Sequence, residues 1–186
     1  MTDHILSALS ALATVLAALA AAAAVWVSWR GIKAQNAQAK ASREDFKLSL
    51  SADLSMKLED RFNEPEHRKI RSAAARALLT NKNLIDAEDV FDFFETVGLM
   101  VRTGALTKDL AYNFFFHWFN MYWVAGQSYI QEERKISKSL WENFEYGYLV
   151  VREIEIDKDA HSTDLKLAED QMRLRKLLQA EIEETQ

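Results

Sequence analysis

The chain contains no cysteine, one proline and five glycines among its 186 residues. The absence of cysteine excludes a disulfide framework, a thiolate zinc site and a cysteine nucleophile. Few Pro and Gly residues, together with many Ala, Leu, Lys, Glu and Arg, favour long helices with few tight turns. The net charge of −5, without a long Lys/Arg run, does not indicate nucleic acid as a partner. We therefore expect one modest all-α domain.

Charged residues are also absent from positions 5–29, where the only polar residues are three serines and one threonine. Because about 20 apolar residues in a helix cross the hydrocarbon core, this segment is predicted to be a transmembrane anchor. A cleaved signal peptide and a buried core helix are the alternatives. The lack of Lys and Arg before the segment argues against the first, and the lack of a polar stripe argues against the second.

The flanking charges predict how the anchor is oriented. No Lys or Arg precedes it, whereas four follow closely: Arg30, Lys33, Lys40 and Arg43. The positive-inside rule then places residues 1–4 outside and everything after the anchor in the cytoplasm. Trp26 and Trp29 fit the aromatic belt on the cytoplasmic side.

The anchor carries two patterns that favour helix association. Its leucines repeat in the manner of a coiled-coil seam, at Leu9, Leu12, Leu16 and Leu19. Small residues recur every four positions, at Ala13, Ala17 and Ala21, and small residues allow helix backbones to approach closely in lipid. We expect the anchor to self-associate, the alternative being an alanine-rich span that merely permits close packing.

Three further segments follow the anchor. Residues 30–62 are predicted to continue as a juxtamembrane helix, with Phe46, Leu50, Leu54, Leu58 and Phe62 on one face. The sequence Asn-Glu-Pro at 63–65 ends that helix and opens a cytoplasmic helical bundle over 63–157. Residues 158–186 form a charged amphipathic helix with a narrow apolar stripe made of Leu167, Leu174, Leu178 and Ile182. Such a stripe usually packs on a partner helix, in cis or in trans.

Local signals mark helix ends within the bundle. Asp86 and Thr107 are predicted N-caps, Gly104 is a predicted C-cap, and Ser139 with Glu142 forms a capping box. The aromatic run at 114–123 is apolar nearly all round a helix, which indicates burial in the core. An exposed patch for oligomerisation or for a membrane surface is the alternative.

Signals for chemistry are few. No P-loop, GxGxxG, GxSxG or HExxH motif occurs, so we expect no cofactor and no metal. Glu64 and His67 have the spacing of a di-iron carboxylate motif, but a second copy is missing. Arg61 and His67 are similar in spacing to the Arg/His pair of HEPN ribonucleases, which implies phosphate binding and proton transfer. Pro65 breaks the helix between them, so catalysis is an alternative and the chain is predicted not to be an enzyme.

The order of features resembles a known family. After the anchor come "FNEPEHRKIR", "FDFFETVGLMVRTGAL", a Trp/Tyr-rich helix and "LWENFEYGYL". This order resembles an uncharacterised family of small bacterial single-pass membrane proteins, known only as a domain of unknown function. The resemblance implies a bacterial inner-membrane location and offers no catalytic residues. A weaker architectural likeness is to the accessory membrane protein of type VI-B CRISPR systems, which implies a pore that supports antiviral defence.

These observations lead to one predicted function and two alternatives. We expect a non-enzymatic, membrane-anchored helical protein that forms homo-oligomers, as an effector or pore in CRISPR-linked antiviral defence. A membrane-tethered HEPN-like ribonuclease with Arg61 and His67 as catalytic residues is one alternative. A membrane-anchored adaptor for a cytoplasmic protein partner is the other.

Overall fold

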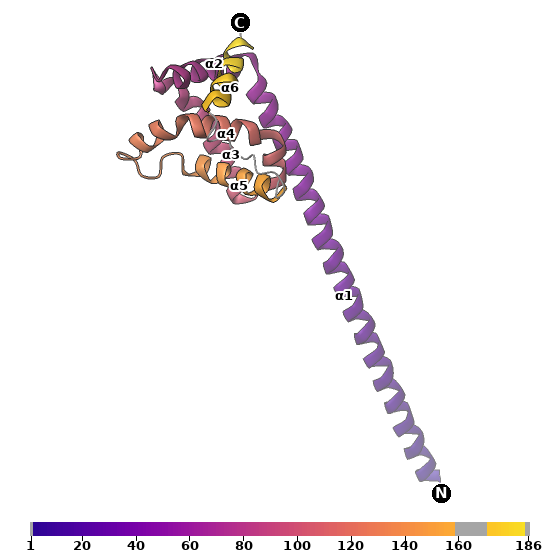
Figure 1. Ribbon diagram of the computed structural model, residues 1–186. Helices are drawn as coiled ribbons and strands as arrows, with labels where there is room; N and C mark the ends of the chain where they lie inside the picture. Colours follow the sequence, from indigo (N-terminus) through magenta and orange to yellow (C-terminus); the bar gives the residue numbers. More distant parts are fainter. Residues whose placement is uncertain (1, 159–170, 185–186) are drawn as a thin grey trace. The chain divides into compact units, whose positions relative to one another are not determined.

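The computed structural model describes residues 2–158 and 171–184 and is helical throughout the elements it defines (Figure 1). Side chains are described at residues 26, 29–33, 35–36, 38–158 and 172–184. The chain divides into two units, Met1–Lys47 and Leu48–Gln186. The all-α fold class predicted from the sequence is thus confirmed.

Helix α1 runs without interruption from Thr2 to Asn63, and its first part makes up the N-terminal unit. Among the residues that the structure describes, no helix combines the length and the apolar character needed to cross a membrane. This finding contradicts the predicted single-pass anchor, together with the inner-membrane location, the N-out orientation and the pore that depended on it. A span requires about 20 residues almost free of charge in one helix, whereas the side chains described in the N-terminal unit, at 26, 29–33, 35–36 and 38–47, are all exposed and include many charged groups.

The residues assigned to that anchor are placed as follows. Trp26 and Trp29 are exposed, and each ring is covered by a cation one turn ahead. The Arg30 guanidinium lies 4.3 Å from the Trp26 ring, and the Lys33 ammonium lies 3.7 Å from the Trp29 ring. The two aromatic residues therefore form cation–π pairs along the helix. The other side chains lie outside the described residues: Leu9, Leu12, Ala13, Leu16, Ala17, Leu19 and Ala21.

The C-terminal unit begins within α1, whose last turns join the core. Leu58 and Phe62 are buried, and the buried Ser51 hydroxyl accepts a hydrogen bond of 2.8 Å from the backbone N–H of Thr107. Helix α1 ends at Asn63 and helix α2 (Pro65–Thr80) begins at Pro65. Proline suits this first helical position because its missing N–H would have no partner there.

The remaining helices are joined by short turns. A 3-10 turn, η1 (Leu84–Ala87), precedes α3 (Glu88–Thr103), so Asp86 lies inside that turn and the N-cap predicted there is wrong. Gly104 ends α3 with a φ of 75°, a left-handed conformation that glycine adopts without strain. Helix α4 (Lys108–Glu133) is capped by Thr107, whose hydroxyl accepts from the backbone N–H of Leu110. Both of these caps confirm the sequence prediction.

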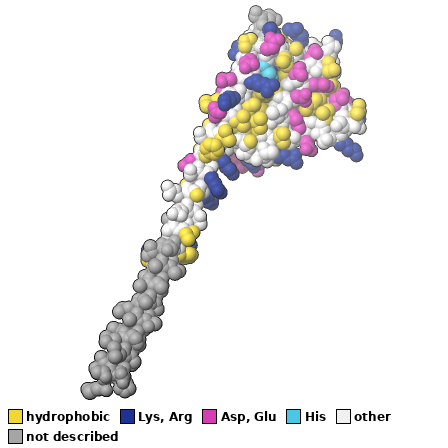
Figure 2. Space-filling view, turned by 180° about the vertical axis from the view of Figure 1, so that it is seen from behind, with side chains coloured by type: hydrophobic (Ala, Val, Ile, Leu, Met, Phe, Trp, Pro, Cys, Tyr) yellow, Lys and Arg dark blue, Asp and Glu magenta, His cyan; other side chains and the backbone are white. Residues whose placement is uncertain are grey.

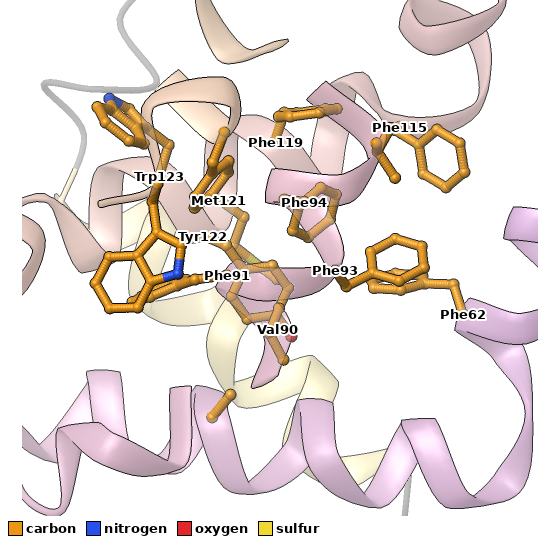
Figure 3. Close-up of a cluster of buried hydrophobic side chains, with 14 of the residues drawn as sticks. Phe62, Val90, Phe91, Phe93, Phe94, Phe115, Phe119, Met121, Tyr122 and Trp123 are labelled. Atoms are coloured by element: carbon orange, nitrogen blue, oxygen red, sulfur yellow. The ribbon is translucent and has the colours of Figure 1, made fainter. Parts of the chain in front are cut away.

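The core is built mainly from aromatic rings of α3 and α4 (Figure 3). Phe115, Phe119 and Tyr122 of the predicted aromatic run are buried, whereas His117 between them is exposed. The ring centroids of Phe94 and Phe119 lie 4.8 Å apart, within the range of favourable aromatic pairs. The aromatic run therefore belongs to the core along most of its faces, as the periodicity indicated.

Helix α5 (Glu142–Lys158) packs directly against α3. A Cβ atom on Gly98 would lie 1.9 Å from the backbone oxygen of Asn143, so only glycine allows this approach. The Glu95 carboxylate accepts hydrogen bonds from the backbone N–H groups of Asn143 and Phe144, at 2.9 and 2.8 Å. The start of α5 is therefore capped from α3, and not by the capping box predicted at Ser139.

Helix α6 (Gln171–Glu183) packs on α2 and contacts α4. Three members of its predicted apolar stripe, Leu174, Leu178 and Ile182, are buried in the core, and Leu167 lies outside the described residues. The stripe was predicted to pack on a partner helix either in the same chain or in a second chain. Its described part packs on helices of the same chain. Those side chains do not offer a surface to a second chain.

Candidate functional site

The structure brings the sequence candidates Arg61 and His67 to one cleft where three helices meet. The cleft has a volume of about 320 Å³. Arg61 comes from the last turn of α1, and His67 from the first turn of α2. The complete lining is Leu58, Arg61, His67, Ile70, Asp89, Asp92, Phe93 and Thr96. The break at Pro65 does not separate the pair, because the chain turns there and both residues line the same cleft.

His67 is half-buried in this cleft. Its ring centroid lies 5.2 Å from that of Phe62 and 5.1 Å from that of Phe93. Burial, followed by the nearby positive charges of Arg71 and Arg61, lowers the pKa of His67 below its ordinary value of 6.5. The imidazole is therefore neutral at pH 7. Its Nδ1 atom is buried and has no hydrogen-bond partner among the described residues.

Helix α3 supplies the acidic side of the cleft. Asp89, Asp92 and Thr96 follow one another at helical spacing on one face, and all three are exposed. The indole N–H of Trp141 donates to Oδ1 of Asp92 at 2.7 Å, which holds that carboxylate in place. The Thr96 hydroxyl donates to the backbone carbonyl of Asp92 at 3.0 Å. Figure 2 shows acidic, basic and apolar side chains mixed on one face of the molecule.

A buried ion pair lies behind the cleft and fixes α6. The Arg71 Nε donates to Oε1 of Glu181 at 2.7 Å, and both side chains are almost fully buried. The same guanidinium donates to the Phe62 carbonyl at 3.0 Å and lies 4.3 Å from the Phe62 ring. Burial raises the pKa of the Glu181 carboxyl, against the opposing effect of the Arg71 charge. This network joins α6 to the Phe62 ring, which in turn touches His67.

Sequence reasoning found Arg61 and His67 but missed Asp89, Asp92 and Thr96. The one available signal was their spacing on α3, which places them on one helix face. Such a spacing is common on solvated helix surfaces, and nothing local tells which face lies opposite His67. Among the described residues, no group of three or more His, Asp or Glu side chains is arranged to hold a metal ion.

The cleft holds charges of both signs beside apolar side chains. A HEPN-like mechanism would place an RNA phosphate beside Arg61 and His67. Arg61 would attract that phosphate, whereas the carboxylates of Asp89 and Asp92, which line the same cleft, would repel it. The cleft also has an apolar floor, made of Leu58, Ile70 and Phe93. This floor and the two carboxylates are complementary to a side chain that is apolar along its stem and cationic at its end.

The comparisons with known proteins give a family and no activity. No curated protein and no solved structure matches the chain. A domain of unknown function, DUF4760, matches residues 11–148. That range contains all the residues that line the cleft, as well as Glu95 and its partners at the start of α5. The resemblance to an uncharacterised family is thus confirmed, and the chain belongs to the DUF4760 family.

Proposed function

We propose that the C-terminal unit is a non-enzymatic adaptor. It binds a partner protein by taking a basic side chain of that partner into the Arg61–His67 cleft. The observation that carries this proposal is the pairing of two carboxylates, Asp89 and Asp92, with an apolar floor in one cleft. The adaptor role was one of the alternatives drawn from the sequence, and the cleft gives it a chemical basis.

Each part of the cleft has a role in such binding. Leu58, Ile70 and Phe93 offer apolar surface to the methylene stem of a lysine, and the two carboxylates offer acceptors to its ammonium group. His67 is neutral, so it adds no repulsive charge. Arg61 favours an acidic residue beside the lysine in the partner. We therefore expect a partner segment in which a lysine and an acidic residue are neighbours.

The experiment follows His67 by NMR while a small probe is added to the full chain. The probe is N-acetyl-lysine methylamide, and the matched control is N-acetyl-norleucine methylamide, which keeps the methylene stem but lacks the ammonium group. We expect the lysine probe to shift the His67 ring resonances with a roughly millimolar Kd, and the norleucine probe to bind more weakly. Equal shifts with both probes, or none with either, would refute the proposal.

Two variants locate the binding and test the alternative. Asp89→Asn should weaken the lysine probe, whereas Glu132→Gln, a change at an exposed glutamate of α4, should not. Cleavage of an RNA oligonucleotide by the wild type, lost in both Arg61→Ala and His67→Ala, would replace the adaptor with the ribonuclease alternative.

A further inference from the structure

One face of α5 is exposed and combines apolar with charged side chains. Leu149 and Ile156 lie seven residues apart on this face, with exposed fractions of 56% and 51%. Arg152 and Glu153 lie between them and flank the line that joins them. The face borders a shallow groove of about 340 Å³, lined by Tyr148, Leu149, Arg152, Glu153, Ile156 and Asp157. Its residues belong to none of the helices that line the Arg61–His67 cleft.

The charges on this face are complementary to those of a second copy. Successive helix residues are about 100° apart around the axis, so Arg152 and Glu153 lie on opposite sides of the line from Leu149 to Ile156. A two-fold axis parallel to α5 exchanges these two sides. It therefore places Arg152 of each chain opposite Glu153 of the other, which gives two equivalent ion pairs. Each apolar residue lies opposite its own copy.

We propose that this face binds a second copy of the chain, with the two α5 helices parallel across a two-fold axis. Leu149 and Ile156 then form two apolar layers, and Arg152 and Glu153 form an ion pair on either side of them. A purely apolar partner would leave Arg152 and Glu153 without partners, which costs free energy. An antiparallel arrangement would set Arg152 against Arg152. The parallel pair satisfies all four side chains, and the assembly carries two Arg61–His67 clefts.

The first test changes the charges and measures assembly of the full chain by sedimentation velocity. Arg152→Glu sets two glutamates opposite each other and should raise the dimer Kd by roughly tenfold or more. The double variant Arg152→Glu with Glu153→Arg restores opposite charges and should recover dimerisation. A wild type that stays monomeric, a Kd unchanged by Arg152→Glu, or a double variant no better than the single would overturn the proposal.

The second test introduces single cysteines, which is straightforward because the chain has none. A disulfide requires Cα atoms within about 7 Å, which a parallel two-fold pair allows at equivalent positions. Leu149→Cys should therefore cross-link to its own copy rapidly under mild oxidation. Ile136→Cys, at a site of 88% exposure outside the proposed interface, is the control for random collisions. Equal cross-linking rates at the two positions would overturn the proposal.

Discussion

The carboxylate of Glu95 joins two segments of the family pattern, "FDFFETVG" and "ENFE". Its removal should lower the free energy of unfolding. It accepts from the backbone N–H groups of Asn143 and Phe144, and from Nδ2 of Asn143 at 2.7 Å. The first four N–H groups of a helix have no hydrogen-bond partner within the helix. Glu95 accepts hydrogen bonds from two of these groups at the start of α5. The same negative charge is also favoured at a helix N-terminus.

The magnitude follows from these contacts. A hydrogen bond to a charged group contributes roughly 1.5–3 kcal/mol, and part of that loss is regained when water reaches the freed N–H groups. We therefore expect Glu95→Ala to lower the free energy of unfolding by about 3 kcal/mol. Glu95→Gln keeps the shape and one acceptor but loses the charge, so it should lower the free energy of unfolding by about half as much as Glu95→Ala.

Urea denaturation followed by far-UV circular dichroism measures both values, with Glu132→Ala as the exposed control. Hydrogen exchange at the amides of Asn143 and Phe144 shows where the change acts. A Glu95→Ala variant whose free energy of unfolding lies within about 0.5 kcal/mol of the wild type at an unchanged m-value would refute this role of the carboxylate, because surface changes scatter by that amount.

Two further predictions concern the cleft and the helix behind it. Glu181→Ala leaves the buried Arg71 charge without its carboxylate, so the free energy of unfolding should fall by about 3–5 kcal/mol, whereas the exposed Glu183→Ala should change it little. Equal losses in the two variants would contradict that assignment. Because the pKa of His67 is lowered in the folded protein, the unfolded chain binds the proton more strongly. The stability from neutral His67 is therefore complete above pH 6.5 and is lost as the pH falls below that value. Partial burial of its ring lowers the pKa of His117 too, so His117 contributes to the dependence of stability on pH with the same sign. His67→Gln should flatten the fall in stability, measured in a His117→Gln background, and an unchanged slope would show that His67 is not the titrating group.

Much of the local structure was predictable from neighbouring residues. Pro65 starts a helix because its ring fixes φ and its missing N–H is not needed there. Gly104 ends α3 and Thr107 opens α4 because a left-handed residue and a hydroxyl acceptor satisfy helix ends locally. The dense aromatic run of α4 is buried because rings that cover most faces of a helix require neighbours on most sides.

The predicted anchor failed for a different reason. The uncharged run at 5–29 predicts a span by its composition alone, whereas the predicted continuation of its helix agrees with α1, which runs to Asn63. Among the described residues no part of it meets the requirements of a span.

Tertiary structure alone decided the start of α5 and the composition of the cleft. Ser139 with Glu142 had the local form of a capping box, but a glutamate 48 positions before Asn143 caps the helix instead. Likewise, Arg61 and His67 could be found by their spacing, whereas Asp89 and Asp92 become their neighbours only when α3 packs against α1 and α2. Local signals are short-range because backbone hydrogen bonds within a helix join residues three or four apart. A site shared by three helices depends instead on which faces the burial of the aromatic core brings together.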